Sequence, residues 1–330
     1  MAFVRNLAEP MIEGHTLENG MDSKNSAGSS KVQGTFLAQM MKIMFRAVAS
    51  FLAYGNGAVA LSALAYTAML SAYFGRVSPP YLAFVLFGTF AAYAYMHLMS
   101  AAQHPDDVVH PVRKYTRGHR VPIAVAGCLS GLVAVFLWTR HFSVFGVPLI
   151  PVAVVVALYP GLGRHFRGLR ARNGLKLPLI VGVWFSLVAL LPLGLSAEGP
   201  PLPESVWVLS AVGAWILGTA LFFDLRDFDI DPQGFTLPQK WGQTRSLRIV
   251  QGLYAGSALL FLFYGGLHSD WRIESWGAVG CLVAAVGLTQ RWSRSGDPMV
   301  VSLWIEILPV FWLLFGVLDH LLGPHLIFSR

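Results

Sequence analysis

The sequence carries little charge for its length. Only 12% of its 330 residues are Asp, Glu, Lys or Arg, whereas 55% are hydrophobic, and the mean hydropathy is +0.57. A soluble domain has about 25% charged residues, so the soluble classes are excluded. The sequence predicts an all-α, polytopic membrane protein.

Cysteine and acidic residues are also scarce. Cys128 and Cys281 both lie in apolar segments, and we interpret them as small core residues rather than as a disulfide or a metal site. The 24 Lys and Arg exceed the 17 Asp and Glu and give a formal net charge of +7. Basic cytoplasmic loops explain such an excess in a membrane protein, so we expect no nucleic-acid partner.

The chain divides into a polar tail and one apolar domain. Residues 1–41 are polar and predict a disordered cytoplasmic tail, without the apolar core of a signal peptide. Residues 42–330 predict a single transmembrane domain. Its apolar segments of roughly spanning length indicate about nine transmembrane helices in one bundle with cytoplasmic loop caps, at 48–74, 80–102, 121–139, 145–160, 177–197, 205–223, 248–267, 274–290 and 298–322.

The basic residues predict which side of the membrane each loop faces. With a cytoplasmic amino terminus, the tail and the loops after even-numbered spans hold 20 of the 24 Lys and Arg. The opposite side holds only Arg76, Arg140, Arg272 and Arg330. This bias is strong and predicts an integral, multi-pass protein whose sixth span ends on the cytoplasmic side.

An acidic motif follows that sixth span. Asp224, Asp227 and Asp231 are spaced i, i+3, i+7, which puts three carboxylates on one face of a helix. Three such carboxylates repel one another unless a positive group lies between them. Mg²⁺, which prefers oxygen ligands and often binds phosphates as well, is the natural candidate. The alternative is a solvated helix end that carries a few acids.

Two further features leave alternatives open. Arg113, Arg117 and Arg120 are spaced i, i+4, i+7 between the second and third spans and would share one helical face suited to phosphate. A basic loop that follows the topology rule, or that contacts anionic lipid, is an equally good interpretation of each. Glu306 lies inside the ninth span, where an acid marks a functional site by default. A Glu hydrogen-bonded within the bundle is about as good an interpretation.

The acidic motif resembles the second signature of the UbiA superfamily of intramembrane prenyltransferases. After the three Asp residues the chain continues with Gly234, then Thr236-Leu237-Pro238 and Gly242. The nine-span plan is similar too, as are Tyr159, the basic run after it, Lys176 and Trp184. The resemblance covers roughly residues 45–325, so 42–330 is interpreted as a UbiA-like domain.

One part of the sequence departs from this pattern. The family's first signature is an Asn followed by Asp residues at about four-residue spacing at the end of the second span. Here the equivalent stretch, 95–102, contains no acid. Asp106 and Asp107 follow a few residues later and are candidates to supply the lost ligands; the other possibility is that this half of the metal site is gone.

The resemblance implies a function. The chain is expected to be an enzyme that uses Mg²⁺ to transfer an isoprenyl group from an isoprenyl diphosphate to a lipophilic, aromatic acceptor among the membrane lipids. It implies Asp224, Asp227 and Asp231 as catalytic metal ligands and Asp106 and Asp107 as ligands of a second ion. The expected substrate-binding residues are Lys176, Arg113, Arg117, Lys240 and Tyr159. A terpene cyclase that uses the diphosphate alone, or a non-catalytic relative that binds an isoprenoid or quinone, are the alternatives.

Overall fold

The computed structural model describes most of the apolar domain: residues 39–41, 44, 48, 50–52, 54–75, 77–104, 110–161, 168–169, 174–196, 202–228, 236–268, 273–295 and 298–322. Every regular element in these ranges is a helix, and they contain no strand. The predicted tail lies outside the described residues except for 39–41, which are helical.

Each predicted span contains a helix. The described helices are α3 (Gly57–Tyr73), α4 (Pro79–Gln103), α5 (Pro111–Gly118), α6 (Arg120–Arg140), the π-helical turn η1 (Phe142–Gly146), α7 (Val147–Leu158), α8 (Lys176–Phe185), the π-helical turn η3 (Ser186–Leu190), α9 (Leu191–Leu195), α10 (Leu202–Arg226), α11 (Leu237–Trp241), α12 (Gln243–His268), α13 (Ile273–Ser295) and α14 (Pro298–Leu322).

Six of the described helices are long and apolar enough to cross a membrane: 79–103, 120–140, 176–195, 205–226, 243–266 and 301–321. Two further apolar helices, 57–73 and 143–158, are shorter. Large apolar side chains also face outward, such as Leu132 (68% exposed) and Leu321 (72% exposed), as suits contact with lipid. The chain is therefore an all-α, integral, multi-pass membrane protein. A count of nine crossings stays a prediction.

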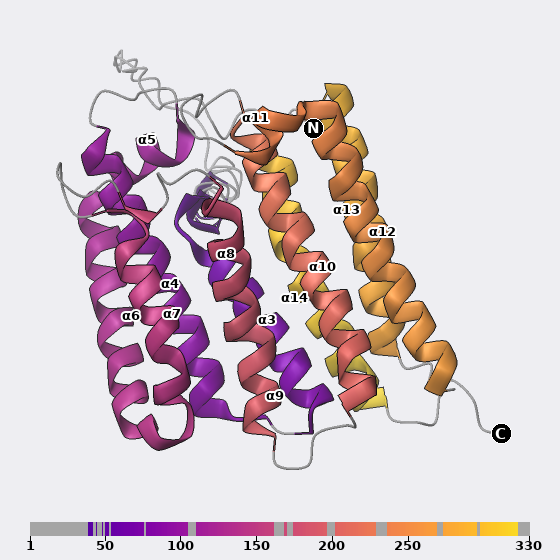
Figure 1. Cartoon of the computed structure of the whole chain (residues 1–330). Coiled ribbons are helices and arrows are strands. Elements are labelled where there is room, and N and C mark those ends of the chain that lie inside the picture. The colour runs from indigo at the N-terminus through magenta and orange to yellow at the C-terminus, as the bar shows by residue number, and fades with distance from the viewer. Residues whose placement is uncertain are drawn as a thin grey trace, which may run out of the picture.

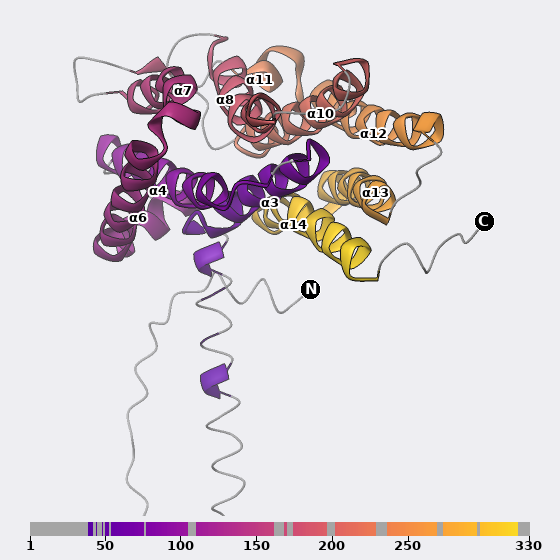
Figure 2. The ribbon, with the colours of Figure 1, turned by 90° about the horizontal axis from the view of Figure 1, so that it is seen from below.

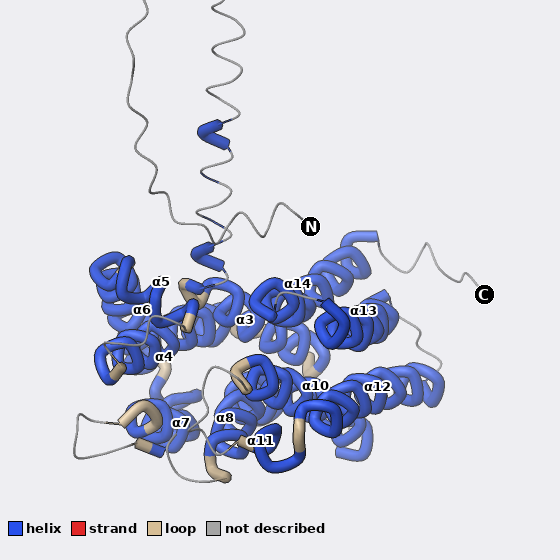
Figure 3. The backbone as a smooth tube through the Cα atoms, turned by 90° about the horizontal axis from the view of Figure 1, so that it is seen from above, coloured by secondary structure: helices blue, strands red, loops and turns tan. Residues whose placement is uncertain are grey.

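The helices form a bundle in two rows (Figures 1–3). One row runs α6, α4, α3, α14 and the other α7, α8, α10, α12, with α13 joining α14 to α12. Contacts between neighbours follow this order around the bundle. The short helices α5 and α11 both lie at the end of the bundle where α4 and α10 finish (Figure 1).

The half of the bundle formed by α3, α10, α12 and α14 is filled with aromatic side chains. Trp215 is fully buried, and its ring lies 5.2 Å from that of Tyr66 and 5.6 Å from that of Trp312. Phe261 packs on Trp312 edge to face, with the ring centres 5.6 Å apart. Such ring pairs add to the free energy of burial. This half is a packed core that leaves the opposite half, around α4, α6, α7 and α8, to enclose a cavity.

A proline shapes the helix that borders this cavity. In the π-helical turn η3, the Leu191 N–H bonds to the Ser186 carbonyl five residues earlier. The next donor in that pattern would be Pro192, which has no N–H, so the Leu187 carbonyl is left without its helical partner. The Tyr81 hydroxyl donates to this carbonyl instead. The bond fixes η3 against α4, because a buried carbonyl needs a donor.

The two cysteines differ in their environments. Cys281 is buried, and its thiol contacts the Leu308 carbonyl with an S–O distance of 3.3 Å, as expected for a small core residue. Cys128 is exposed on α6, so the prediction that it is a core residue is wrong. The apolar character of its segment reflects contact with lipid rather than with the core. Both thiols are free.

Candidate functional site

Two of the three predicted carboxylates lie together at the end of α10. Asp224 is in the last turn of the helix, and Asp227 follows directly after it. The Asp227 N–H bonds to the Phe223 carbonyl at 3.1 Å, so the helical pattern continues through Asp227. A three-residue spacing in this pattern brings two side chains to the same side. Asp231 lies outside the described residues.

Asp224 is paired with Lys176. The Lys176 ammonium, on the first residue of α8, makes a salt bridge with Oδ1 of Asp224. The side chain of Asp224 is 4% exposed and that of Lys176 is 16% exposed. A charge buried this deeply requires a partner, because removal of one member leaves the other uncompensated. The pair therefore ties the start of α8 to the end of α10.

Asp227 is held by its neighbour in sequence. Arg226 donates from Nε to Oδ1 at 2.7 Å and from Nη2 to Oδ2 at 3.1 Å, and its guanidinium lies 5.1 Å from the ring centre of Phe223. Burial alone would raise the pKa of the Asp227 carboxyl. The Arg226 guanidinium, with smaller contributions from His110 and Lys176, holds that pKa below its ordinary value of 3.8. Asp227 is therefore a carboxylate at neutral pH.

The short helix α5 contributes further cations. Arg113 is buried and donates from Nε to the Ser100 hydroxyl at 3.1 Å. Arg117 donates to the His104 carbonyl at 3.4 Å. His110, the residue before α5, contributes to the lowered pKa of Asp227, so the start of α5 lies near the end of α10. The expected shared face with Arg120 is wrong, because α5 ends at Gly118 and Arg120 begins α6.

The remaining predicted residues are scattered. Lys240 is exposed on α11. Asp106 and Asp107 lie outside the described residues. Tyr159 follows the end of α7 and lines the cavity described next.

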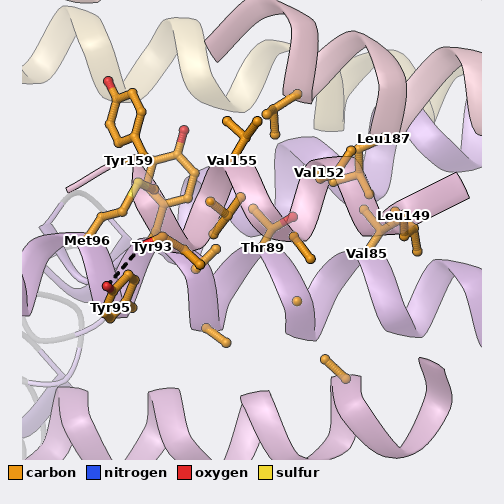
Figure 4. Close-up of a pocket in the computed structure, with 18 of the residues that line it drawn as sticks. Val85, Thr89, Tyr93, Tyr95, Met96, Leu149, Val152, Val155, Tyr159 and Leu187 are labelled. Atoms are coloured by element: carbon orange, nitrogen blue, oxygen red, sulfur yellow. Dashed lines mark hydrogen bonds between the residues drawn. The ribbon is translucent and has the colours of Figure 1, made fainter. Parts of the chain in front are cut away.

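An apolar cavity of about 430 Å³ lies between α4, α6, α7, α8 and η3. Its walls are aliphatic and aromatic, and Tyr93, Met96 and Tyr159 gather at one end (Figure 4). Val85, Leu149 and Leu187 lie at the other end (Figure 4). At the end with Tyr93 and Met96, the Tyr95 hydroxyl donates to the Ala157 carbonyl at 3.2 Å and holds α4 against α7 (Figure 4).

Tyr93 connects the cavity to the charged groups. Its hydroxyl accepts a hydrogen bond from Trp184 Nε1 at 3.1 Å, and both residues line the cavity. Tyr93 also interacts electrostatically with Arg226 and Glu306. Tyr93 thus lies in the cavity wall and within the electrostatic influence of Arg226 at the end of α10.

The sequence prediction missed Arg226 and Tyr93. Arg226 has a signal in the sequence, since it is the one base between the acids of the motif. For Tyr93 there was none, because its role depends on Trp184, 91 residues away.

The oxygen donors suit one divalent ion on the α10 side. Asp224 and Asp227 are adjacent carboxylates, and Mg²⁺ takes one or two of these together with water and phosphate oxygens. On the α4 side, the acid-free stretch 95–102 includes Ser100, whose hydroxyl accepts the hydrogen bond from Arg113. Within the described ranges, no group of three His, Cys, Asp or Glu residues is arranged to hold a metal.

Comparisons with known proteins show the fold. No protein-family model and no curated protein matches the sequence. Among solved structures, a UbiA homologue from Archaeoglobus fulgidus bound to GPP and Mg²⁺ matches with a TM-score of 0.57 and 13% identity, over 82% of this chain and 98% of that one. A UbiA homologue from Aeropyrum pernix K1 matches with a TM-score of 0.53 and 15% identity, over 80% and 98%.

A digeranylgeranylglyceryl phosphate synthase matches as well, with a TM-score of 0.51 and 13% identity, over 83% of this chain and 97% of that one. The matches cover nearly the whole of each solved chain. The chain therefore has the fold of these UbiA homologues.

Proposed function

We propose that the chain transfers an isoprenyl group from an isoprenyl diphosphate to a lipophilic, aromatic acceptor within the membrane, with Mg²⁺ as cofactor. The observation that carries the proposal is the position of Tyr93, between an apolar cavity of about 430 Å³ and the charged groups at the end of α10. An isoprenyl diphosphate has the same division into an apolar chain and a charged head.

The charged groups supply carboxylate ligands for the metal and cations for the diphosphate. Asp224 and Asp227 would hold Mg²⁺, which neutralises the leaving diphosphate when it is bound. Lys176, now paired with Asp224, would then turn to the phosphate oxygens. Arg113 is a second cation for them, and a guanidinium matches phosphate geometry. These cations stabilise the negative charge that develops as the C–O bond breaks.

The cavity accommodates the isoprenyl chain of the donor. Its apolar walls exclude water, which would otherwise capture the allylic cation. Tyr93, Tyr159 and Trp184 line the cavity, and aromatic faces attract a cation. The cavity and the charged groups therefore supply a place for each part of the donor substrate.

Two further predictions belong to this proposal. The distribution of Lys and Arg supports a cytoplasmic side for the end of α10, and we propose residues 42–330 as the catalytic domain. The solved neighbours bound to DMAPP or GPP with Mg²⁺ support the donor class for this chain.

A transfer assay tests the proposal. Protein in lipid nanodiscs is incubated with Mg²⁺ and geranyl or geranylgeranyl diphosphate, with or without a set of lipophilic phenols, and products are identified by mass spectrometry. We expect a prenylated phenol only when both substrates are present. Asp224→Asn should lower its formation at least 100-fold, whereas Asp319→Asn, at the far end of α14, should not change it.

Two results would contradict the proposal. A terpene formed from the diphosphate alone would identify a cyclase. No turnover of either diphosphate by folded protein, with any phenol in the set, would favour a non-catalytic isoprenoid-binding protein.

A further inference from the structure

The α4 side of the candidate site carries a cation in place of acids. The stretch 95–102 contains no Asp or Glu. Within it, the buried Ser100 hydroxyl accepts a hydrogen bond at 3.1 Å from Nε of Arg113, which is also buried. This bond orients the guanidinium and uses one of its several N–H donors. Because a guanidinium stays protonated in proteins, Arg113 places a permanent positive charge on this side.

Helix geometry puts Arg113 level with Lys176. The hydrogen bond from Trp184 to Tyr93 fixes α8 against α4. On α4, Ser100 follows Tyr93 by seven residues, and on α8, Trp184 follows Lys176 by eight. At 1.5 Å per residue these separations are about 10 Å and about 12 Å. Both run toward the end of the bundle where α4 and α10 finish (Figure 1).

The two sides at this level differ in chemistry. The α10 side has the carboxylates of Asp224 and Asp227, and Mg²⁺ binds through one or two carboxylates together with phosphate oxygens. These acids therefore suit one ion. A second divalent ion on the α4 side would meet Arg113 as a like charge, and a buried site screens such repulsion poorly. The residues of 95–102 and Arg113 do not fit a second metal site.

We propose that the site binds the diphosphate with a single divalent ion, held on the α10 side, and that the Arg113 guanidinium takes the place of a second ion on the α4 side. This inference rests on the proposed function, since it concerns the head group of the donor. A guanidinium can donate two parallel hydrogen bonds to phosphate oxygens. Its charge is present before any metal binds, so part of the affinity for the diphosphate should need no metal.

Counting the metal ions in the complex tests the first half of the inference. Protein in phosphatidylcholine nanodiscs is mixed with an equimolar amount of geranyl S-thiolodiphosphate, a non-hydrolysable donor analogue, and titrated with Mn²⁺ in place of Mg²⁺. Free Mn²⁺ is measured by electron paramagnetic resonance, with empty nanodiscs and the same analogue as the reference. We expect one bound Mn²⁺ per complex, and its loss in Asp224→Asn.

Binding of the analogue in EDTA tests the role of Arg113. Wild type should still bind it, and Arg113→Gln should weaken this binding at least tenfold. Arg113→Lys keeps the charge and should recover most of the loss. Lys114→Gln removes the exposed cation next to it and should bind as the wild type does.

Geraniol provides the control for the fold, because it has the same apolar chain without the diphosphate. After correction for partition into lipid, it should bind wild type and the three variants of α5 within twofold. A loss confined to the analogue then belongs to the charged head group.

The outcomes separate this inference from the proposed function. Two Mn²⁺ ions per complex would overturn it, and loss of the second in Asp106→Asn with Asp107→Asn would assign that ion to those acids. Unchanged metal-free binding in Arg113→Gln would overturn the role of Arg113, as would an equal loss of geraniol and the analogue, which indicates a purely structural residue. Wild type that binds geraniol but not the analogue, with or without Mn²⁺, would overturn the proposed function as well.

Discussion

Lys176 and Asp224 form a buried salt bridge between the first residue of α8 and the last turn of α10. The two residues are far apart in the sequence: Lys176 directly precedes the fifth predicted span, and Asp224 directly follows the sixth. Their pairing brings the charged end of the candidate site together with the helix that forms one wall of the apolar cavity.

This pair should show strong coupling in stability. Lys176→Met leaves the Asp224 carboxylate buried without its cation, which costs about 3 kcal/mol when one member of a buried pair is removed. Asp224→Asn added to Lys176→Met should recover most of that loss. The double-mutant cycle compares the unfolding of wild type, Lys176→Met, Asp224→Asn and the double variant in detergent without Mg²⁺. Additive effects of the two substitutions would show that the pair is not formed.

The pH dependence of stability should reveal how the two hydrogen bonds from Arg226 control the ionisation of Asp227. In the wild type the folded pKa of Asp227 is lowered, so its contribution is complete above the unfolded pKa of about 3.8 and is lost as the pH falls through the lower folded value. In Arg226→Gln, burial outweighs the remaining cations and raises this pKa. The ionised group then opposes folding, and stability should rise as the pH falls through the raised value.

Thermal unfolding of wild type and Arg226→Gln, each compared with its Asp227→Asn counterpart between about pH 3 and about pH 7 in EDTA, isolates this group. The slope with pH attributed to Asp227 should have opposite signs in the two backgrounds. The same sign in both would mean that Arg226 does not control the ionisation of Asp227.

The sequence predicts the helices well and the site only in part. Long apolar segments determine where helices form, and each predicted span contains one. The predicted span 145–160 begins inside the π-helical turn at 142–146, which precedes α7. The break at Gly118, which separates Arg117 from Arg120, has no apolar pattern to mark it.

The site depends on contacts that no local pattern contains. The spacing of Asp224 and Asp227 predicts neighbouring carboxylates, and the structure places both at the end of α10. Their cations could not be read from the spacing, because Lys176 reaches Asp224 only through the packing of α8 on α10. The cavity likewise results from the packing of four helices with similar apolar sequences.

The length of the isoprenyl chain should depend on the depth of the cavity. Val152 lines the cavity on α7, and Val152→Trp would fill part of its volume. We expect binding of a geranylgeranyl diphosphate analogue to weaken about tenfold, roughly the loss of one or two buried methylene groups, while a dimethylallyl analogue is unaffected. Leu132→Trp, on the exposed face of α6, should affect neither. Equal effects on both analogues would mean that the isoprenyl chain does not bind in this cavity.

The hydrogen bond from Tyr81 should stabilise the π-helical turn. Tyr81→Phe leaves the Leu187 carbonyl without a donor, which should cost roughly 1–3 kcal/mol. Pro192→Ala supplies a backbone N–H five residues after Leu187, so the same substitution should cost less in that background. Unfolding of the single and double variants measures the difference. An unchanged cost would mean that Pro192 is not the reason the carbonyl needs Tyr81.

The most direct measurement is equilibrium binding of a non-hydrolysable geranyl diphosphate analogue to purified protein, titrated with and without Mg²⁺. Wild type should bind it with an affinity that rises with Mg²⁺. Asp224→Asn should remove that dependence, and Lys176→Gln should weaken binding at least tenfold. Lys114→Gln, which removes an exposed cation of α5, should bind as the wild type does. Binding that is absent at every Mg²⁺ concentration, or that is identical in all four proteins, would contradict a diphosphate site at the end of α10.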